Sequence, residues 1–268
     1  MALPLSLDGK TALITGGSRG IGAETARLFI EAGARVAFNY RQGRAQAEAL
    51  VTELGGSDAT RPARCVAIEQ ELSSPADGHA LVDKAVKALG RLDILAANHG
   101  IWESEDVPVE QMTEAQWRRT LAVNLDAVFG LVQAATAQML EQSTPAGRDP
   151  RGHIVLVSST AGQRGEAYHA DYAVTKGALI SLTKSLSTEL APKGIRVNCV
   201  APGWVATDMS AATLADATLG AKIREGIPVG RAASPREIAG PILFLCTPLA
   251  GFISGEILNV NGGAVLVG

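Results

Sequence analysis

The alternation of short apolar segments with longer helical ones is the feature that most constrains this fold. Most of the short segments are continuously apolar, which is typical of strands buried on both faces of a sheet. Between them lie longer segments with helical periodicity, so the order predicts right-handed crossovers and a doubly wound α/β fold. We expect a parallel seven-stranded sheet with helices on both faces. The expected strands are residues 11–15, 35–40, 65–70, 93–97, 153–158, 196–200 and 257–260, and the expected helices are about 20–32, 43–54, 75–90, 113–141, 171–191 and 235–246.

The chain reads as a single domain over residues 1–268. Its hydrophobic content of 47% is enough for one large core. We find no internal repeat and no linker that would divide it. Two segments rich in turn-forming residues, 55–63 and 143–151, are interpreted as solvated surface loops.

Several classes of function are disfavoured by composition. The net charge is −3 and no basic stripe is present, which argues against nucleic acid as a partner. No unbroken apolar run of 18 residues occurs, so no membrane span is expected, and the start "MALPLSLDGK" does not resemble a secretory signal. The scattered Cys65, Cys199 and Cys246 fit reduced core thiols of a cytoplasmic protein better than disulfides or a metal site.

The first strand leads into a glycine-rich turn, "TGGSRGIG", at the start of a helix. Gly16, Gly20 and Gly22 allow backbone N–H groups to approach a pyrophosphate, which would face the positive end of the helix. The turn therefore predicts a Rossmann-type dinucleotide site. The alternative is a strand-to-helix turn that merely uses glycines.

The end of the second strand indicates which dinucleotide is bound. NAD-binding proteins usually place an acidic residue there for the ribose 2′-hydroxyl. This chain has Asn39, Tyr40 and Arg41 instead, and Arg19 lies inside the glycine turn. Because guanidinium groups bind phosphate through a planar fork, we predict NADP(H) as the cofactor. The alternative is that Arg41 and Arg44 are ordinary solvated residues.

The segment "ADYAVTKGAL" places Tyr172 four residues before Lys176, so a helix brings them to one face. A phenol has an ordinary pKa of about 10, and we expect the neighbouring ammonium to lower that pKa toward a value useful for acid–base chemistry. The pair would exchange a proton with an alcohol or carbonyl oxygen. Tyr168 has no lysine four residues on, so Tyr172 is preferred, and His169 is interpreted as a surface residue.

Two further polar elements accompany the pair. Ser158 and Ser159 follow a buried strand, where hydroxyl groups face the ligand crevice of such sheets; the alternative role is a helix or turn cap. Asn124 lies in an apolar helical segment, and a buried amide must find partners. It therefore either repairs a local backbone defect or holds a water molecule.

Together these motifs resemble the short-chain dehydrogenase/reductase family, in its NADP-dependent branch. The resemblance runs from "GKTALITGGSRGIG" to "GEILNVNGG" and includes "CVAPGWVATDM", which is similar to the family's Pro-Gly motif beside the nicotinamide. It implies Tyr172 as the general acid–base, Lys176 as the residue that lowers its pKa and binds the nicotinamide ribose, and Ser159, thirteen residues before the tyrosine, as the group that binds the substrate oxygen. Asn124 would hold a water in a proton relay to the lysine.

The motifs and the resemblance together predict the cofactor contacts. Departures from the family pattern are "AANHG", where His99 replaces a small residue, and Glu71-Leu72, where an Asp-Val pair commonly holds the adenine. The expected cofactor-binding residues are Gly16, Ser18, Arg19, Gly20, Ile21, Gly22, Asn39, Tyr40, Arg41, Glu71, Leu72, Asn98, Gly100, Tyr172, Lys176, Pro202, Gly203, Val205 and Thr207, and no metal is expected.

The resemblance to 3-oxoacyl-carrier-protein reductases implies NADPH-dependent reduction of a carbonyl to an alcohol. A small-molecule substrate would lie under a lid formed by residues 205–226, with Trp102 and Trp204 either lining the pocket or packing elsewhere. Lys193 is the one basic residue considered for docking an acyl carrier protein. The resemblance also implies a homotetramer. The alternatives are a non-catalytic NADP-binding sensor, and an epimerase or dehydratase that retains its cofactor.

Overall fold

The expected parallel sheet is present. The computed structural model describes residues 5–55, 63–143 and 150–267. Within these residues the strands form one seven-stranded sheet in the order β3-β2-β1-β4-β5-β6-β7, and every neighbouring pair is parallel. The strands are β1 (Thr11–Ile14), β2 (Arg35–Tyr40), β3 (Cys65–Glu69), β4 (Ile94–Ala97), β5 (Gly152–Val157), β6 (Ile195–Pro202) and β7 (Ile257–Val260).

Strand β1 shows why the strands are apolar throughout. All four of its residues are buried. Because successive side chains point to opposite faces, Ala12 and Ile14 enter one hydrophobic core while Leu13 enters the other. Each central strand therefore contributes to two cores, and a polar residue on either face would be buried.

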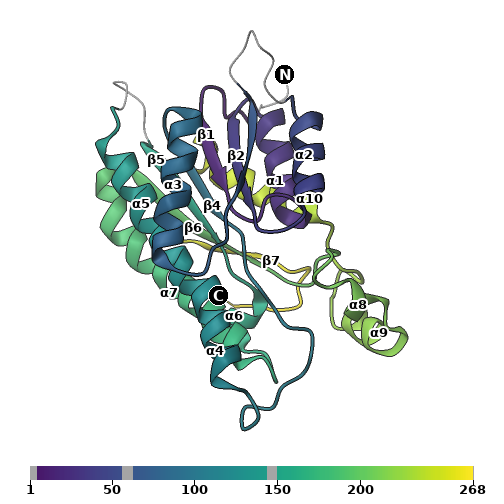
Figure 1. The fold of residues 1–268 in the computed structure, drawn as a ribbon. Coiled ribbons are helices and arrows are strands. Elements are labelled where there is room, and N and C mark those ends of the chain that lie inside the picture. The colour runs from purple at the N-terminus through teal and green to yellow at the C-terminus, as the bar shows by residue number, and fades with distance from the viewer. Residues whose placement is uncertain (1–4, 56–62, 144–149, 268) are drawn as a thin grey trace.

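Helices cover both faces of the sheet, as Figure 1 shows. Residues of α1, α2 and α10 pack into the core that contains Ile14, and residues of α3, α5 and α7 pack into the core that contains Leu13. The helices are α1 (Gly20–Glu31), α2 (Arg44–Glu53), α3 (Pro75–Leu89), α4 (Glu114–Leu121), α5 (Ala127–Glu141), α6 (Thr160–Arg164), α7 (Ala170–Leu190), α8 (Ala211–Ala215), α9 (Ala217–Glu225) and α10 (Pro235–Leu245).

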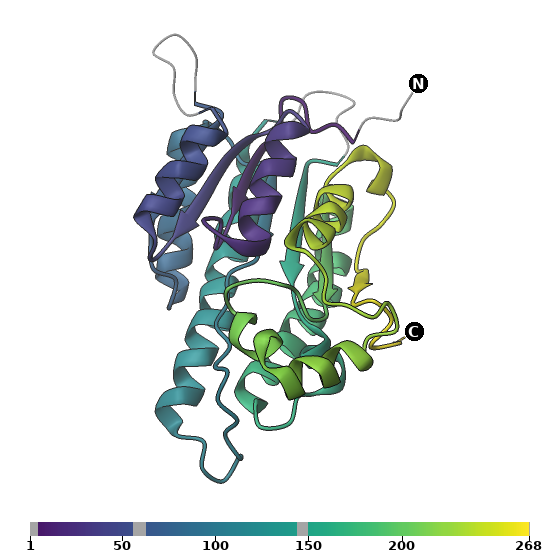
Figure 2. The ribbon, with the colours of Figure 1, turned by 90° about the vertical axis from the view of Figure 1, so that its right-hand side faces the viewer.

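The predicted lid contains two short helices, α8 and α9. Figure 1 places them with α6 at one end of the sheet, and Figure 2 shows the pair, in light green, lying across that end. Helices α6 and α8 span five residues each. Such segments are too short to show a helical period, which is why the sequence pattern does not reveal them.

The expected helix at 113–141 is interrupted. It begins at Glu114, and residues Ala122–Asp126 form a π-helical turn between α4 and α5. By length and composition alone Glu114–Glu141 could cross a membrane, although no unbroken apolar run identifies it. Nearly half of its most apolar window is buried, and α5 packs against α3, which is the usual situation of a core helix in a soluble protein.

The cysteines and two surface loops were also predicted from the sequence. Cys65, Cys199 and Cys246 are buried with free thiols, as expected. Burial raises the pKa of Cys199 to about 11, which keeps this thiol protonated and unreactive at neutral pH. The loops predicted at 55–63 and 143–151 lie largely outside the described residues.

Candidate active site

A pocket of about 340 Å³ opens at the carboxyl ends of the strands. It lies where the strand order reverses between β1 and β4, the position at which open α/β sheets bind ligands. Every residue predicted for catalysis or cofactor binding lines this pocket except Gly22 and Asn124. The fold thus brings together residues that are up to 191 positions apart, from Gly16 to Thr207.

The glycine turn has a conformation and a packing that favour glycine. Gly16 and Gly20 have positive φ angles of 66° and 55°. Gly22 lies behind the turn, where a Cβ atom would stand 2.2 Å from the Gly16 carbonyl oxygen. Helix α1 then begins without a side-chain cap and without an acidic residue in its first turn. Its terminal N–H groups remain available to an anion, so this part of the pocket fits a pyrophosphate.

Asn39 and Tyr40 support the site instead of presenting free polar groups. The Asn39 side chain accepts a hydrogen bond from the Gly16 N–H at 2.8 Å and donates one to the Gln70 carbonyl at 2.9 Å. The Tyr40 hydroxyl donates to Glu69. These bonds hold the glycine turn against the ends of β2 and β3, although both residues still border the pocket.

Arg19 and Arg41 stand at the rim of this end of the pocket, each with an acidic neighbour at 3.5 Å. Arg19 faces Asp208, and Arg41 faces Glu71. All four side chains are substantially exposed, and exposed ion pairs of this kind contribute about 0 to 1 kcal/mol. A phosphate could therefore compete for either guanidinium. Leu72 is buried beside Glu71, so it offers an apolar contact.

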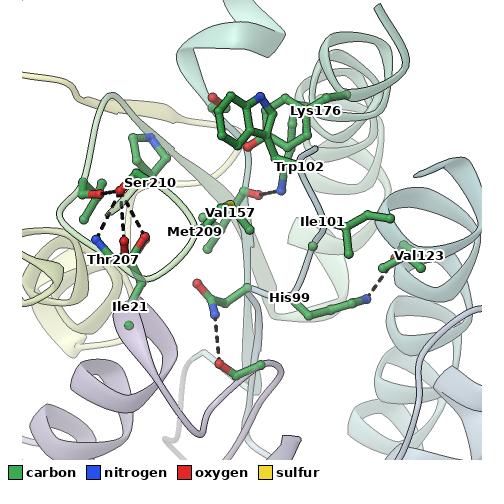
Figure 3. A pocket seen from close by; sticks show the side chains of 18 of the residues that line it. Ile21, His99, Ile101, Trp102, Val123, Val157, Lys176, Thr207, Met209 and Ser210 are labelled. Carbon is green, nitrogen blue, oxygen red and sulfur yellow. Dashed lines mark hydrogen bonds between the residues drawn. The ribbon is translucent and has the colours of Figure 1, made fainter. Parts of the chain in front are cut away.

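His99 connects the glycine turn to the helix that carries Asn124. The Thr15 hydroxyl oxygen accepts hydrogen bonds from the Asn98 and His99 N–H groups, so it donates its own proton to His99 Nδ1 at 2.8 Å. Nε2 then carries the proton and donates to the Val123 carbonyl at 3.0 Å. Figure 3 shows this second bond. Desolvation lowers the pKa of His99 to about 4, so the ring is neutral at physiological pH.

Asn124 is fully buried at the π-helical turn. Its side chain pairs with both backbone groups of Ile101, accepting from the N–H at 2.8 Å and donating to the carbonyl at 2.9 Å. It also donates to the Thr175 hydroxyl at 3.3 Å. Of the two roles considered, the structure favours a backbone one, because the amide fixes the backbone at Ile101, which borders the pocket.

Tyr172 and Ser159 meet at the pocket wall, while Ser158 is engaged elsewhere. The Ser158 hydroxyl donates to the Lys176 carbonyl at 2.7 Å, a buried structural bond. Ser159 caps α6, where its oxygen accepts from the Ala161 N–H. Its hydroxyl group is also close enough to Tyr172 to lower the pKa of that phenol. The thirteen-residue spacing therefore selects the serine that contacts the phenol.

The structure corrects the expected direction of the Tyr172 pKa shift, because the phenol pKa in the free protein is raised and not lowered. Burial raises the pKa of Tyr172 to about 12, the nearby Ser159 hydroxyl offsets part of that rise, and the charge of Glu166 adds to it. The Lys176 ammonium lies over the phenol ring, 5.6 Å from its centre, and donates to the Val157 carbonyl at 2.8 Å (Figure 3). Burial lowers the pKa of Lys176 to about 8.

The segment after β6 closes the pocket from the lid side. Pro202 ends β6, and Val205 pairs with Ala233 in an isolated bridge. At Gly203 a Cβ atom would stand 3.0 Å from Asn261 Cβ, so a small residue is favoured there. Thr207 lies against Gly20, which links the lid to the glycine turn.

The pocket is also lined by His99 and Glu166, which no sequence motif assigned to catalysis or cofactor binding. His99 departs from the family pattern, and that departure was the available signal. Glu166 had no such signal, because it lies in a loop between two motifs. Lys193, which was expected near the entrance of the pocket, lies far from it. It follows the end of the 21-residue helix α7 opposite to Tyr172, about 30 Å along the helix axis, and pairs with Glu189.

Comparison with known proteins gives a consistent result over nearly the whole chain. Residues 16–265 match the family model described as "Enoyl-(Acyl carrier protein) reductase". The chain is 35% identical over 261 residues to the 3-oxoacyl-[acyl-carrier-protein] reductase FabG of Aquifex aeolicus strain VF5, with 97% of this chain and 99% of the relative covered.

Solved structures resemble this chain in fold and in sequence over nearly its whole length. A 3-ketoacyl-(acyl-carrier-protein) reductase from Brucella melitensis, complexed with NADH, matches with a TM-score of 0.85 and 32% identity, over 97% of this chain and all of that one. A short chain dehydrogenase from Burkholderia cenocepacia J2315, in complex with NADP, matches with a TM-score of 0.84 and 33% identity, over 96% and 98% of the two chains.

Proposed function

Because the chain belongs to the short-chain dehydrogenase/reductase family, we propose that it is a ketoreductase that uses NADPH to reduce a carbonyl to an alcohol. The observation that carries the proposal is the pocket itself. One end has the glycine turn and the uncapped helix start, and the other end has a phenol next to a serine hydroxyl and a buried ammonium. An anion-binding end joined to a proton-donating end is what hydride transfer to a carbonyl requires.

The residues around the pocket fit NADP(H), which supplies the hydride when bound. We propose that the glycine turn and α1 hold the pyrophosphate, that Arg19 and Arg41 hold the 2′-phosphate, and that Glu71 and Leu72 border the adenine. The nicotinamide end would be held by Asn98, Gly100, Tyr172, Lys176, Pro202, Gly203, Val205 and Thr207. Relatives complexed with NADP and with NADH support the dinucleotide class.

The protein's own groups then move the proton. The substrate carbonyl oxygen would accept hydrogen bonds from Ser159 and Tyr172, which stabilise the negative charge that develops there. Tyr172 would give its proton to that oxygen. With a pKa of about 12, the free phenol is fully protonated at neutral pH, so it is ready to act as an acid in the direction of reduction. Lys176 stabilises the phenolate left behind, and Asn124 positions the Ile101 segment beside it.

A screen of NADPH oxidation over β-ketoesters, cyclic ketones, steroids, sugars and acyl thioesters would test this function. We expect stoichiometric loss of NADPH absorbance with alcohol formation from at least one ketone class. Binding of NADPH without turnover on any carbonyl would contradict the proposal and favour a sensor. Product formation without net NADPH consumption would favour an epimerase or dehydratase.

Replacing Arg41 by Ala is expected to raise the KM for NADPH by about 10- to 100-fold and to change the KM for NADH little, because the charged contact is made only to the 2′-phosphate. Steady-state kinetics with both cofactors measure this. Arg44→Ala is the matched control, since Arg44 is exposed, pairs with Glu69 and lies outside the pocket. Equal losses with NADPH and NADH would place the 2′-phosphate elsewhere.

We also propose a homotetramer. Its support is apolar surface on α5 and α7, where Phe129 and Val174 are about half exposed, and near the C-terminus, where Phe252 and Leu266 are almost fully exposed. Surface of this kind needs a second burial partner. Light scattering is expected to give about four times the 27.7 kDa chain mass, and a monomeric mass would contradict it.

We also propose a cytoplasmic location. Three buried free thiols support the cytoplasm. The similarity to a 3-oxoacyl-[acyl-carrier-protein] reductase supports a carrier-bound substrate. Lys193 does not support docking of a carrier protein, because it lies too far from Tyr172.

A further inference from the structure

Three loops meet at the Tyr172 end of the pocket and supply residues that the proposed mechanism does not use. Trp102 comes from the loop after β4, Glu166 from the loop after α6 and Trp204 from the segment after β6. The two indole rings are nearly perpendicular, with centroids 6.0 Å apart. Figure 3 shows Trp102 at the Lys176 end of the pocket, away from Ile21 and Thr207 at the glycine turn.

Glu166 has unused acceptor capacity in this wall. Glu166 is half-buried and lines the pocket; burial raises the pKa of its carboxyl group, and the nearby Trp102 side chain offsets part of that rise. Among the residues that the structure describes, no lysine, arginine or histidine nitrogen forms an ion pair with it. The titratable side chains that act on it are those of His169, Arg164 and Asp106, and the charge of Glu166 in turn raises the pKa of Tyr172.

A half-buried carboxyl group in a pocket loses part of its hydration when a ligand fills the pocket, so a ligand that donates a hydrogen bond to it is favoured over one that does not. Such a ligand would also be near Tyr172, because both residues line the same pocket and the charge of Glu166 acts on the phenol. An ammonium ligand is disfavoured, since it would share this end of the pocket with the buried ammonium of Lys176 and with Arg164. A neutral hydroxyl group donates without that repulsion.

We propose that Glu166 accepts a hydrogen bond from a hydroxyl group next to the substrate carbonyl, and that Trp102 and Trp204 cover the hydrocarbon face of that substrate. The substrate class is therefore small, neutral α-hydroxy ketones. This assignment rests on the proposed ketoreductase function. It sets 3-oxoacyl thioesters aside as preferred substrates, because their carbon chain carries no donor beside the carbonyl.

The test compares kcat/KM for 2-hydroxycyclohexanone and 2-methylcyclohexanone, which differ by a hydroxyl in place of a methyl group. The wild type is expected to prefer the hydroxy ketone by about 10- to 100-fold, the effect of one hydrogen bond to a charged group. Glu166→Ala should reduce that preference to less than about threefold. Glu166→Gln, which keeps the shape and one acceptor oxygen, should give an intermediate value.

Glu110→Ala is the matched control, because Glu110 is exposed and lies outside the pocket. It should keep the full preference. A second pair, hydroxyacetone and aminoacetone, tests charge, and the hydroxy compound is expected to be the better substrate.

Three outcomes would overturn the assignment while leaving the ketoreductase function intact. They are equal use of the two cyclohexanones by the wild type, a preference that survives in Glu166→Ala, and preferential reduction of aminoacetone. Failure of the wild type to oxidise NADPH with any ketone would instead overturn the proposed function, and the substrate assignment with it. The ratio of two substrates on one enzyme sample is insensitive to partial misfolding of a variant.

Discussion

Replacing Tyr172 by Phe is expected to lower kcat for ketone reduction by about a thousandfold or more, while the Kd for NADPH changes by less than about threefold. Proton transfer by a positioned side chain contributes about 10² to 10⁴ in rate, and the variant also loses a donor to the developing oxyanion. Single-turnover absorbance and cofactor fluorescence measure the two quantities. The ring that packs under Lys176 is retained, so the pocket wall should keep its shape.

Tyr168→Phe is the matched control for this experiment. Tyr168 lies four residues before Tyr172 but is about half exposed and outside the pocket. We expect it to keep turnover within about twofold of the wild type. If pure Tyr172→Phe protein retained more than a few per cent of wild-type kcat, Tyr172 would be rejected as the proton donor.

Replacing Lys176 by Met should lower kcat/KM by about 100-fold, because the phenolate left after proton transfer loses the ammonium beside it. The variant fills a similar volume without charge or donor. The pH dependence gives a second readout. Burial lowers the pKa of Lys176 to about 8, so the group is an ammonium below that pH and loses its charge as the pH rises through it.

The wild-type kcat/KM for reduction is therefore expected to fall as the pH rises through about 8, since kcat/KM reports groups of the free enzyme. In Lys176→Met this fall of kcat/KM at alkaline pH should be absent. Lys184→Met, on the exposed face of the same helix, should retain both the rate and the fall. An unchanged fall in Lys176→Met would assign the titration to another group.

The correction at Tyr172 illustrates what a spacing pattern omits. Four residues along a helix place Lys176 and Tyr172 on one face, and they do lie there. The pKa of the phenol, however, depends on desolvation, on Ser159 and on Glu166, which belong to other elements. The ammonium donates to the Val157 carbonyl instead of the phenol oxygen. Sequence spacing predicted the proximity, whereas the packing determined its electrostatic consequence.

Asn124 and His99 show the same limit. The buried amide was recognised as needing partners, but its pairing with Ile101 depends on a π-helical turn that no local pattern indicates. His99 was noted in the sequence because it replaces a small residue of the family pattern. Its two hydrogen bonds join Thr15 to Val123, residues 108 positions apart in the chain, so its role follows from the fold.

The order of buried strands and helices, the glycine turn and the spacing of Tyr172 and Lys176 were determined by the amino-acid sequence, because strand burial, turn conformation and helical spacing are local or periodic properties. The preference for Ser159 over Ser158 came from the family resemblance. The parallel seven-stranded sheet agrees with that prediction, and the structure brings Tyr172 and Lys176 into one pocket with the glycine turn. Only the tertiary structure decided which polar groups are satisfied and which face the pocket. Glu166 beside Tyr172, and Trp102 against Trp204, result from loops that meet when the strands align. Their electrostatic effects depend on distances and burial that no single segment specifies.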